Sequence, residues 1–242
     1  DLKSSDELRG RIPQSHPMSK TKQTMQFEEG HIYHIYNQGN NRQKIFFERE
    51  NYLFFLKKMG EHLLPHCNIL AWCLMPNHFH WMVEVTKRDI VVAHGVSQSN
   101  LASGNHPAKS LEKLRSINDS IGILLRSYTR AINKAHKKSG SLFRPKTKAE
   151  CLTCIDGITP AFFNTKYGTI INIKDPEKEY LQQCFNYIHE NPVKAGMVKN
   201  ATEWEFSSCL DYYGKRNGKL INRERAKKIL YNSSDDFKSS DE

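Results

Sequence analysis

Two histidines lie one residue apart in an apolar segment of the sequence. His78 and His80 belong to "CLMPNHFHWMVEV", residues 73–85, which otherwise has the composition of a buried strand. Because side chains alternate along a strand, both imidazoles share one face, and Phe79 and Trp81 share the other. Two neighbouring imidazoles can bind one cation. A His-x-His pair also arises by chance in a chain with 11 histidines, so the pair predicts a metal site only in a suitable context.

That context is "CFNYIHENPVKAGMV", residues 184–198, in a helix expected to run from Pro176 to about Glu190. Tyr187 and Asn191 lie on the flank of its apolar stripe, about 40° apart. If this helix crosses the sheet near the histidines, Asn191 can be a third ligand and Tyr187 a nucleophile. Two imidazoles and an amide oxygen with open positions suit Mg²⁺ or Mn²⁺ and a substrate phosphate. The alternative is that Tyr187 only edges an amphipathic helix and Asn191 only ends it.

Hydrophobic periodicity predicts the elements that position these residues. The expected order is a strand at 31–37, a helix at 48–64, a hairpin of 67–75 and 78–85, a polar loop at 86–106, a helix at 107–138, a strand at 141–155, a strand pair at 162–173 bent at Tyr167–Gly168, and the helix at 176–190. The core order strand, helix, strand, strand, helix, strand predicts an α+β fold. We expect a ferredoxin-like antiparallel sheet with two helices on one face, the other face open, and a C-terminal helix that carries Tyr187.

The composition favours a polyanionic partner. The chain has 36 basic and 26 acidic residues, a net charge of +10 and a pI near 9.3, which makes nucleic acid the leading candidate. No apolar run approaches the roughly 20 residues of a membrane span, and no signal peptide is evident. We therefore expect a cytoplasmic, nucleoid-associated protein with no membrane partner, either a monomer or a homodimer.

The six cysteines are expected to be reduced. Cys151 and Cys154 could be half of a zinc site, but no second Cys/His pair follows at finger or ribbon spacing, which favours ordinary strand cysteines. Residues 1–17 are polar and aperiodic and are predicted to be a tag or disordered. Residues 18–213 are predicted to form one domain, and 214–242 a basic C-terminal tail.

Three motifs in this order resemble a known family. "MPNHFHWMVEV", "YIHENPVKAGMV" and "EWEFSSCLDYY" are similar to segments of the REP-associated tyrosine transposases, relatives of the single-tyrosine HUH transposases. The resemblance runs from about Gly30 to Tyr213. It implies that His78, His80 and Asn191 hold a divalent metal and that Tyr187 attacks DNA. The family's early arginine is replaced by Gln38, while Arg42 remains a candidate for phosphate binding.

The implied activity is that of a metal-dependent DNA strand transferase, a transposase or endonuclease acting on single-stranded DNA beside a REP-like hairpin. Tyrosine would displace a 3′-hydroxyl and form a 5′-phosphotyrosine link, which that hydroxyl can reverse without ATP. One alternative is a nucleic-acid-binding protein with an inactive HUH site. Another is a metal-dependent phosphodiesterase that uses water.

Charge placement predicts the DNA track. Residues 107–148 contain 11 basic and 2 acidic side chains, and residues 215–228 contain 7 and 1. Such runs are often only solvated faces, but Tyr128, Phe143 and Tyr167 lie among or near the first and could stack on unpaired bases. The expected DNA-binding residues are Arg42, Arg126, Arg130, Lys134, Arg144, Lys146 and Lys148.

Overall fold

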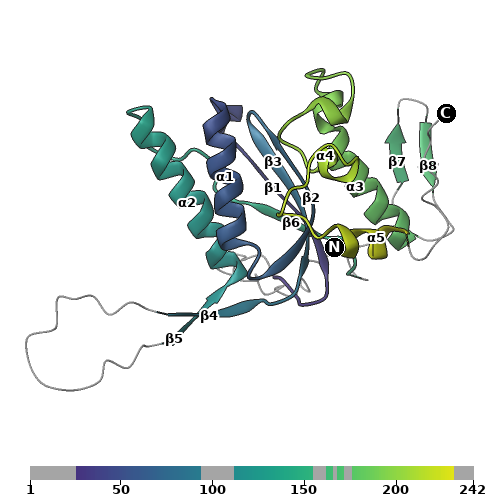
Figure 1. Ribbon diagram of the computed structural model, residues 1–242, viewed down its shortest axis with the longest axis horizontal. Helices are drawn as coiled ribbons and strands as arrows, with labels where there is room; N and C mark the ends of the chain where they lie inside the picture. The colour runs from purple at the N-terminus through teal and green to yellow at the C-terminus, as the bar shows by residue number, and fades with distance from the viewer. Residues whose placement is uncertain (1–25, 94–111, 155–161, 166–167, 172–175, 232–242) are drawn as a thin grey trace, which may run out of the picture.

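The computed structural model describes residues 26–93, 112–154, 162–165, 168–171 and 176–231. In chain order the elements are β1 (Ile32–Gln38), η1 (Asn40–Arg42), α1 (Arg49–His62), β2 (Cys67–Met75), β3 (His78–Val85), β4 (Asp89–Ala93), β5 (Glu112–Ser116), α2 (Ile117–Ala135), β6 (Lys148–Cys151), β7 (Phe162–Thr165), β8 (Gly168–Ile171), α3 (Pro176–Lys194), η4 (Ala201–Glu203), α4 (Cys209–Tyr212) and α5 (Arg223–Tyr231). Figure 1 shows α1 and α2 on one side of the main sheet and α3, α4 and α5 on the other.

The main sheet has the strand order β2-β3-β1-β6, and every neighbouring pair in it is antiparallel. With its two crossover helices this is the ferredoxin-like α+β arrangement, so the predicted fold class is confirmed. The predicted hairpin is also present, because β2 and β3 are joined by Pro76–Asn77 alone. Residues that follow β1 stabilise this turn by hydrogen bonds. The amide of Gly39 donates to the carbonyl of Asn77 at 2.8 Å, and the amide of Ile45 donates to the carbonyl of Pro76 at 2.8 Å.

The first core lies between the sheet and helices α1 and α2. The alternation predicted for β3 is confirmed, because its odd-numbered residues face this core: Phe79, Trp81, Val83 and Val85. From the helices it receives Phe55 and Met59 of α1 and Leu124 and Tyr128 of α2, all fully buried. Burial of each such side chain stabilises the fold by about 1.5–3 kcal/mol.

The opposite face of the sheet is covered, which corrects the prediction of an open face. A second core there joins side chains from the sheet to side chains from α3 and α5, namely Ile32, Leu70, Ala71, Cys73, Met75, Met82, Leu152, Leu181, Cys184, Phe185, Ile188, Ala226 and Leu230. The apolar stripe predicted for α3 provides four of these residues. The reason for the error is that β2 is apolar on both faces, and such a strand must be buried on both sides.

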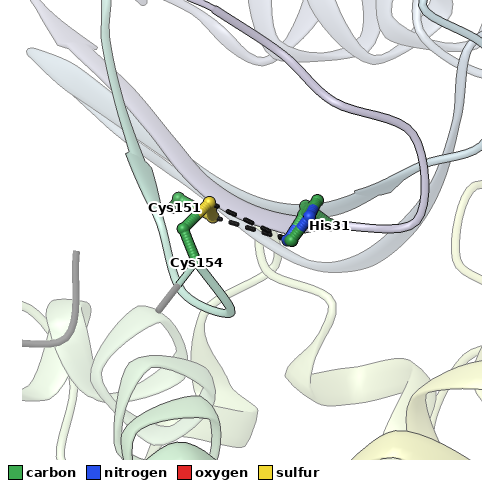
Figure 2. A group of neighbouring side chains, drawn as sticks. All are labelled: His31, Cys151 and Cys154. Carbon is green, nitrogen blue, oxygen red and sulfur yellow. Dashed lines mark hydrogen bonds between the residues drawn. A yellow bond between two sulfur atoms is a disulfide. The ribbon is translucent and has the colours of Figure 1, made fainter. Parts of the chain in front are cut away.

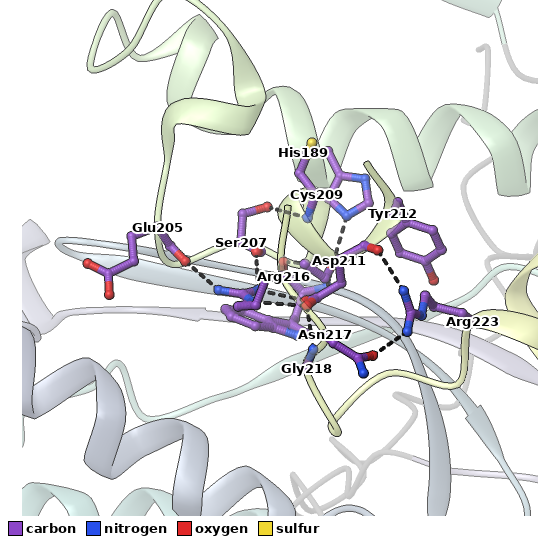
Figure 3. Close-up of polar contacts among 12 residues, drawn as sticks. His189, Glu205, Ser207, Cys209, Asp211, Tyr212, Arg216, Asn217, Gly218 and Arg223 are labelled. Carbon is purple, nitrogen blue, oxygen red and sulfur yellow. Dashed lines mark hydrogen bonds and ion pairs between the residues drawn. The ribbon is translucent and has the colours of Figure 1, made fainter. Parts of the chain in front are cut away.

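Residues 214–231 of the predicted basic tail pack against the sheet. Arg225 Nε of α5 donates to the Glu84 carboxylate of β3 at 2.9 Å, and Leu230 is buried in the second core. Before α5, the buried carboxylate of Asp211 accepts from the guanidinium of Arg216 at 2.9 and 2.7 Å and from the amide of Gly218 at 2.7 Å (Figure 3). A charge buried this deeply is tolerated because both of its oxygens are hydrogen-bonded.

Residues 86–116 were predicted to be a polar loop followed by the start of a helix, and the structure differs from this prediction. Residues 89–93 and 112–116 form the antiparallel pair β4 and β5, which Figure 1 shows projecting from the end of the sheet. The following helix begins at Ile117, ten residues later than predicted, because Ser116 caps it: the Ser116 hydroxyl accepts from the amide of Asp119 at 3.1 Å. The predicted strand 141–155 is likewise shorter, with only Lys148–Cys151 in the sheet.

Two further predictions concern the C-terminal half. The strand pair is confirmed as β7 and β8, paired in register from Phe162↔Ile171 to Thr165↔Gly168. The prediction that Asn191–Pro192 ends the helix is wrong, because α3 continues through Pro192 to Lys194. Pro192 lies in the last turn, where the helix loses little by lacking one amide donor.

Two of the cysteines form a bond that the sequence did not predict. Cys151 and Cys154 are joined by a disulfide, with their Cα atoms 5.6 Å apart, which corrects the expectation that they are reduced. The other four are free and buried, as expected for small apolar side chains: Cys67, Cys73, Cys184 and Cys209. No helix among the described residues combines the length and apolar character needed to cross a membrane.

A buried histidine makes the first core sensitive to acid. His66 is fully buried between the sheet and α2. Its Nδ1–H donates to the carbonyl of Lys87 at 2.9 Å, so its Nε2 accepts from the hydroxyl of Ser120 at 2.8 Å. Burial lowers the pKa of this imidazole below the ordinary 6.5, which means that the unfolded chain takes up a proton before the folded one does.

Stability should therefore fall as the pH drops below about 6.5, by up to about 1.4 kcal/mol per pH unit from this residue until its folded pKa is reached. The measurement is urea unfolding of the wild type and of His66→Gln at pH 7.5 and 5.0. The variant should be less stable at pH 7.5 but should lose less stability on acidification. Equal losses in the two proteins would show that His66 does not contribute.

Candidate active site

The register of three strands brings the polar side chains of the site together. Residues directly opposite each other in an antiparallel pair point to the same face. His80 of β3 is opposite Tyr36 of β1, which is opposite Lys148 of β6, and His78 is opposite Gln38. The two histidines thus share the α3 side of the sheet, as their spacing predicted, with their ring centroids 5.0 Å apart.

A third histidine supports the pair. His34 of β1 lies against His80, with 2.9 Å between its Nε2 and Nδ1 of His80. Burial lowers the pKa of His80 to about 2, with the neighbouring His34 and His78 adding to the effect, and burial lowers that of His34 to about 4. Both rings are therefore neutral at pH 7, and one donates to the other. When His80 Nδ1–H is the donor, His80 Nε2 keeps its lone pair and can bind a cation.

His78 faces Asn191 with two acceptors in contact. Its Nδ1 is 2.6 Å from Oδ1 of Asn77, which can only accept, so the proton of the neutral ring is on Nδ1. The lone pair of Nε2 then points at Oδ1 of Asn191, 3.3 Å away. Burial also lowers the pKa of His78, which disfavours a second proton. Two acceptors that face each other without a proton repel, and a cation between them would satisfy both.

The amide of Asn191 can face His78 in two orientations. Asn191 Nδ2 is buried and has no hydrogen-bond partner. If the amide were rotated by 180°, Nδ2 would donate to Nε2 of His78, and Oδ1 would occupy the buried position without a partner. The donor set at this point, an imidazole nitrogen and an amide oxygen 3.3 Å apart, matches the spacing of about 3 Å between adjacent ligands of a cation bound at about 2.1 Å.

Tyr187 lies beside the imidazoles on the exposed flank of α3. Its ring centroid is 5.4 Å from that of His80 and 6.0 Å from that of His34, in both cases edge to face. The residue is 41% exposed, so an incoming molecule can reach its side chain. One turn from Asn191, Lys194 places its ammonium 5.2 Å from the centre of the Tyr187 ring, a cation–π contact that restrains the ring.

Tyr36 is a second tyrosine near the site, and its hydroxyl is already engaged. It donates to the carboxylate of Glu150, the residue before Cys151 on β6. Burial, this hydrogen bond and the nearby negative charge all raise the pKa of Tyr36. Of the two tyrosines at the cleft, Tyr36 is therefore the poorer nucleophile.

A cleft of about 240 Å³ opens beside these residues. Its walls are Tyr36, Asn37, Gln38, His78, Phe79, His80, Arg144, Lys146, Lys148 and Tyr187. Three of the predicted DNA-binding side chains, Arg144, Lys146 and Lys148, are thus at the site itself and are exposed. They lie in residues 144–148, which end at the first residue of β6. The amide of Arg144 donates to the carbonyl of Gln38 at 2.9 Å and so fixes the start of this segment.

The other predicted DNA-binding residues lie elsewhere. Arg126, Arg130 and Lys134 are exposed along one side of α2, the helix that packs on the opposite face of the sheet (Figure 1). Arg42 is exposed in η1, after β1, where its carbonyl accepts from Asn77 at 3.4 Å.

The prediction that aromatic side chains stack on bases is wrong for two of the three. Tyr128 is fully buried and donates to the carbonyl of Ile45 at 2.6 Å, and Phe143 is buried in the same core. Both side chains belong to the first core, so they are not available to stack on bases. Tyr167 lies outside the described residues.

Sequence reasoning missed His34, Asn77 and Lys194. The segment "HIYHIYN" places His34 and Tyr36 on the same face, but the pairing of His34 with His80 depends on a register between residues 46 positions apart. Lys194 is seven residues after Tyr187, so the helical period could have identified it.

Comparison with known proteins gives little beyond the general arrangement. No family model matches the chain, and no curated protein matches it. The chain is similar to a solved structure of a REP-associated tyrosine transposase bound to a REP hairpin, at 18% sequence identity over 79% of this chain and 83% of that chain, with a TM-score of 0.42.

Proposed function

We propose that this protein is a DNA strand transferase of the tyrosine transposase type, which cleaves and rejoins single-stranded DNA beside a hairpin. One observation carries the proposal: an accessible phenol and two imidazoles line one cleft with three cationic side chains, and the amide oxygen of Asn191 lies 3.3 Å from Nε2 of His78. The sequence motifs around His78, Tyr187 and Phe206 suggest the same chemistry independently. A phosphodiester is an anion, and its charge would complement the three cationic side chains beside the phenol.

The reaction assigned to Tyr187 is an in-line displacement at phosphorus. Its hydroxyl oxygen forms a bond to the 5′-phosphate, the bond from phosphorus to the 3′-oxygen breaks, and the proton lost by the phenol ends on the released 3′-hydroxyl. One phosphodiester replaces another, so the hydroxyl can attack the phosphotyrosine and restore a DNA strand. Arg144, Lys146 and Lys148 would hold the strand through its phosphates and so position the bond that breaks.

Mg²⁺ or Mn²⁺ fits the donors of the cleft, with His78 and His80 offering Nε2 and Asn191 offering Oδ1. Such an ion, when bound, polarises a phosphoryl oxygen and offsets its growing negative charge. His34 would act as a positioning residue, because its hydrogen bond decides which nitrogen of His80 is free. Asn77 does the same for His78.

Asn191 provides the test of the metal site. Asn191→Ala should weaken Mn²⁺ binding at least tenfold, because it removes the only oxygen donor of the set, and Asn191→Asp should tighten it, because it adds a negative charge. Binding would be measured by electron paramagnetic resonance of free Mn²⁺ at pH 7.5.

Asn186→Ala is the matched control. Asn186 is on the same helix and bonds to Gln182 at 3.1 Å, away from the histidines, and its loss should not alter the affinity. Identical Mn²⁺ affinities for Asn191→Ala and the wild type would exclude Asn191 as a ligand.

Tyr187 provides the test of the reaction. Incubating the protein with Mg²⁺ and a single-stranded hairpin oligonucleotide labelled on the 3′ side of the cleavage point should give a label that stays with the protein in denaturing electrophoresis. Tyr187→Phe should abolish this adduct, because it removes the attacking oxygen, and should change DNA affinity less than threefold.

Tyr180→Phe is the control, since Tyr180 is on the same helix one heptad earlier and packs against the second core. It should retain the adduct. Cleavage that persists in Tyr187→Phe without an adduct would indicate hydrolysis by water. Hairpin binding by a wild type that never cleaves would indicate a binding protein with an inactive site.

The basic side chains of the cleft can be compared directly with those of α2. Replacing Arg144, Lys146 and Lys148 by Ala should reduce the salt dependence of single-strand binding by about 2 in log–log slope, because each phosphate contact contributes about 0.7. The same change at Arg126, Arg130 and Lys134 should have a smaller effect. The measurement is fluorescence anisotropy over a range of salt concentrations. An equal or larger effect at α2 would place the DNA on the other face.

A further inference from the structure

A cluster of one histidine and two cysteines lies outside the cleft. His31 directly precedes β1, Cys151 ends β6, and Cys154 follows three residues later, so the strand pairing brings the three side chains together (Figure 2). His31 Nδ1 is 3.9 Å from the sulfur of Cys151 and 3.8 Å from that of Cys154. One nitrogen thus faces both sulfurs at nearly the same distance. All three side chains are half-buried.

The contacts around His31 make its Nδ1 a hydrogen-bond acceptor. Its Nε2 lies 3.5 Å from a carboxylate oxygen of Glu28, which can only accept, so the proton of the neutral ring belongs on Nε2. Nδ1 then accepts from the hydroxyl of Thr153 at 3.1 Å, and that hydroxyl accepts from the amide of Ile32 at 3.0 Å. A metal-binding histidine usually donates one ring N–H to a carboxylate and offers the lone pair of the other ring nitrogen to the metal. Nε2 and Nδ1 of His31 have this arrangement.

The spacing of the three atoms suits a tetrahedral metal. With Zn–N near 2.0–2.1 Å and Zn–S near 2.3 Å, adjacent ligand atoms are about 3.6 Å apart for N and S and about 3.8 Å for two sulfurs. The observed nitrogen–sulfur distances of 3.8 and 3.9 Å are close to the first value. Breaking the disulfide and separating the sulfurs by rotation of the cysteine side chains would supply the second.

We propose that His31, Cys151 and Cys154 form a zinc site in the reduced protein, and that the disulfide is its oxidised, metal-free form. A dithiol reductant gives two electrons to the disulfide and becomes a disulfide itself, leaving two cysteine thiols on the protein. Zn²⁺ then binds His31 Nδ1 and both sulfurs, and the two thiol protons pass to solvent. The fourth position is left to water, as in Cys₂His sites.

The ligand types separate this site from the cleft. Thiolates select Zn²⁺ over Mg²⁺ and Mn²⁺, whereas the amide and phosphate oxygens expected at the cleft suit Mg²⁺ and Mn²⁺. The two sites share β6, whose first residue, Lys148, lines the cleft and whose last, Cys151, belongs to the cluster. The metal would fasten this edge strand to the start of β1 through His31, whereas the disulfide joins Cys151 only to Cys154, three residues further along the same segment. The zinc site is independent of the proposed DNA chemistry.

Cobalt substitution tests the proposal, because only thiolate ligands give Co²⁺ an intense charge-transfer absorption in the near ultraviolet. The full-length protein, reduced with a dithiol and freed of excess reductant, should bind one equivalent of Co²⁺ with this absorption and lose it on addition of Zn²⁺. The oxidised protein should show none. Cys151→Ser and Cys154→Ser should each weaken or abolish it, and His31→Gln should weaken Co²⁺ binding at least tenfold.

Cys67→Ser is the matched control, because serine can keep the hydrogen bond from Cys67 to the carbonyl of Leu63, and it should leave the absorption unchanged. A variant with both His78→Ala and His80→Ala should also keep it, which separates this result from the fate of the proposed function. The proposal is overturned if the reduced wild type shows no charge-transfer absorption, if the double serine variant of Cys151 and Cys154 keeps it, or if alkylation shows that the disulfide resists reduction.

Discussion

The packing of α3 against the sheet is the contact on which the candidate site depends. The histidines belong to β3, but the phenol and the amide oxygen belong to a helix about 110 residues further along the chain. Leu181, Phe185 and Ile188 join that helix to apolar residues of β2 and β3 in the second core. A helix turns by about 100° per residue, so once this stripe is buried, Tyr187 and Asn191 must lie at the edge where the histidines are. Hydrophobic burial here determines the position of the polar groups.

The same packing explains why the cleft is small and local. If the α3 face of the sheet were open, the histidines would be solvated and free to take up protons. Because α3, α4 and α5 cover that face, His34 and His80 are buried, and their pKa values are well below neutral pH. Neutral imidazoles are what a cation requires, since a protonated ring has no lone pair to offer. The cover thus keeps the imidazoles neutral, the form that the proposed metal site requires.

Much of the fold could be predicted because local patterns carry it. The alternation in β3, the stripe on α3 and the turn at Pro76–Asn77 each depend on neighbouring residues, and the order of the elements along the chain predicted the α+β fold class. The cover over the second face could not be read in this way. Its apolar residues, such as Leu70 and Met82, occur in strands already assigned to the first core. The apolar run of β2 indicates burial on both faces, but no local pattern shows which helices cover the second face.

The least predictable features involve β6, which joins two clusters that are distant in sequence. Of its four residues, Lys148 reaches the cleft, Glu150 binds the hydroxyl of Tyr36 and Cys151 meets His31. Each contact depends on the register with β1, which is set by pairs such as Tyr36↔Lys148 and Tyr33↔Cys151. A slip by one residue would turn every one of these side chains to the other face. A short edge strand has few hydrogen bonds to hold its register, so a metal that joined Cys151 to His31 would also keep Lys148 and Glu150 in their positions at the cleft.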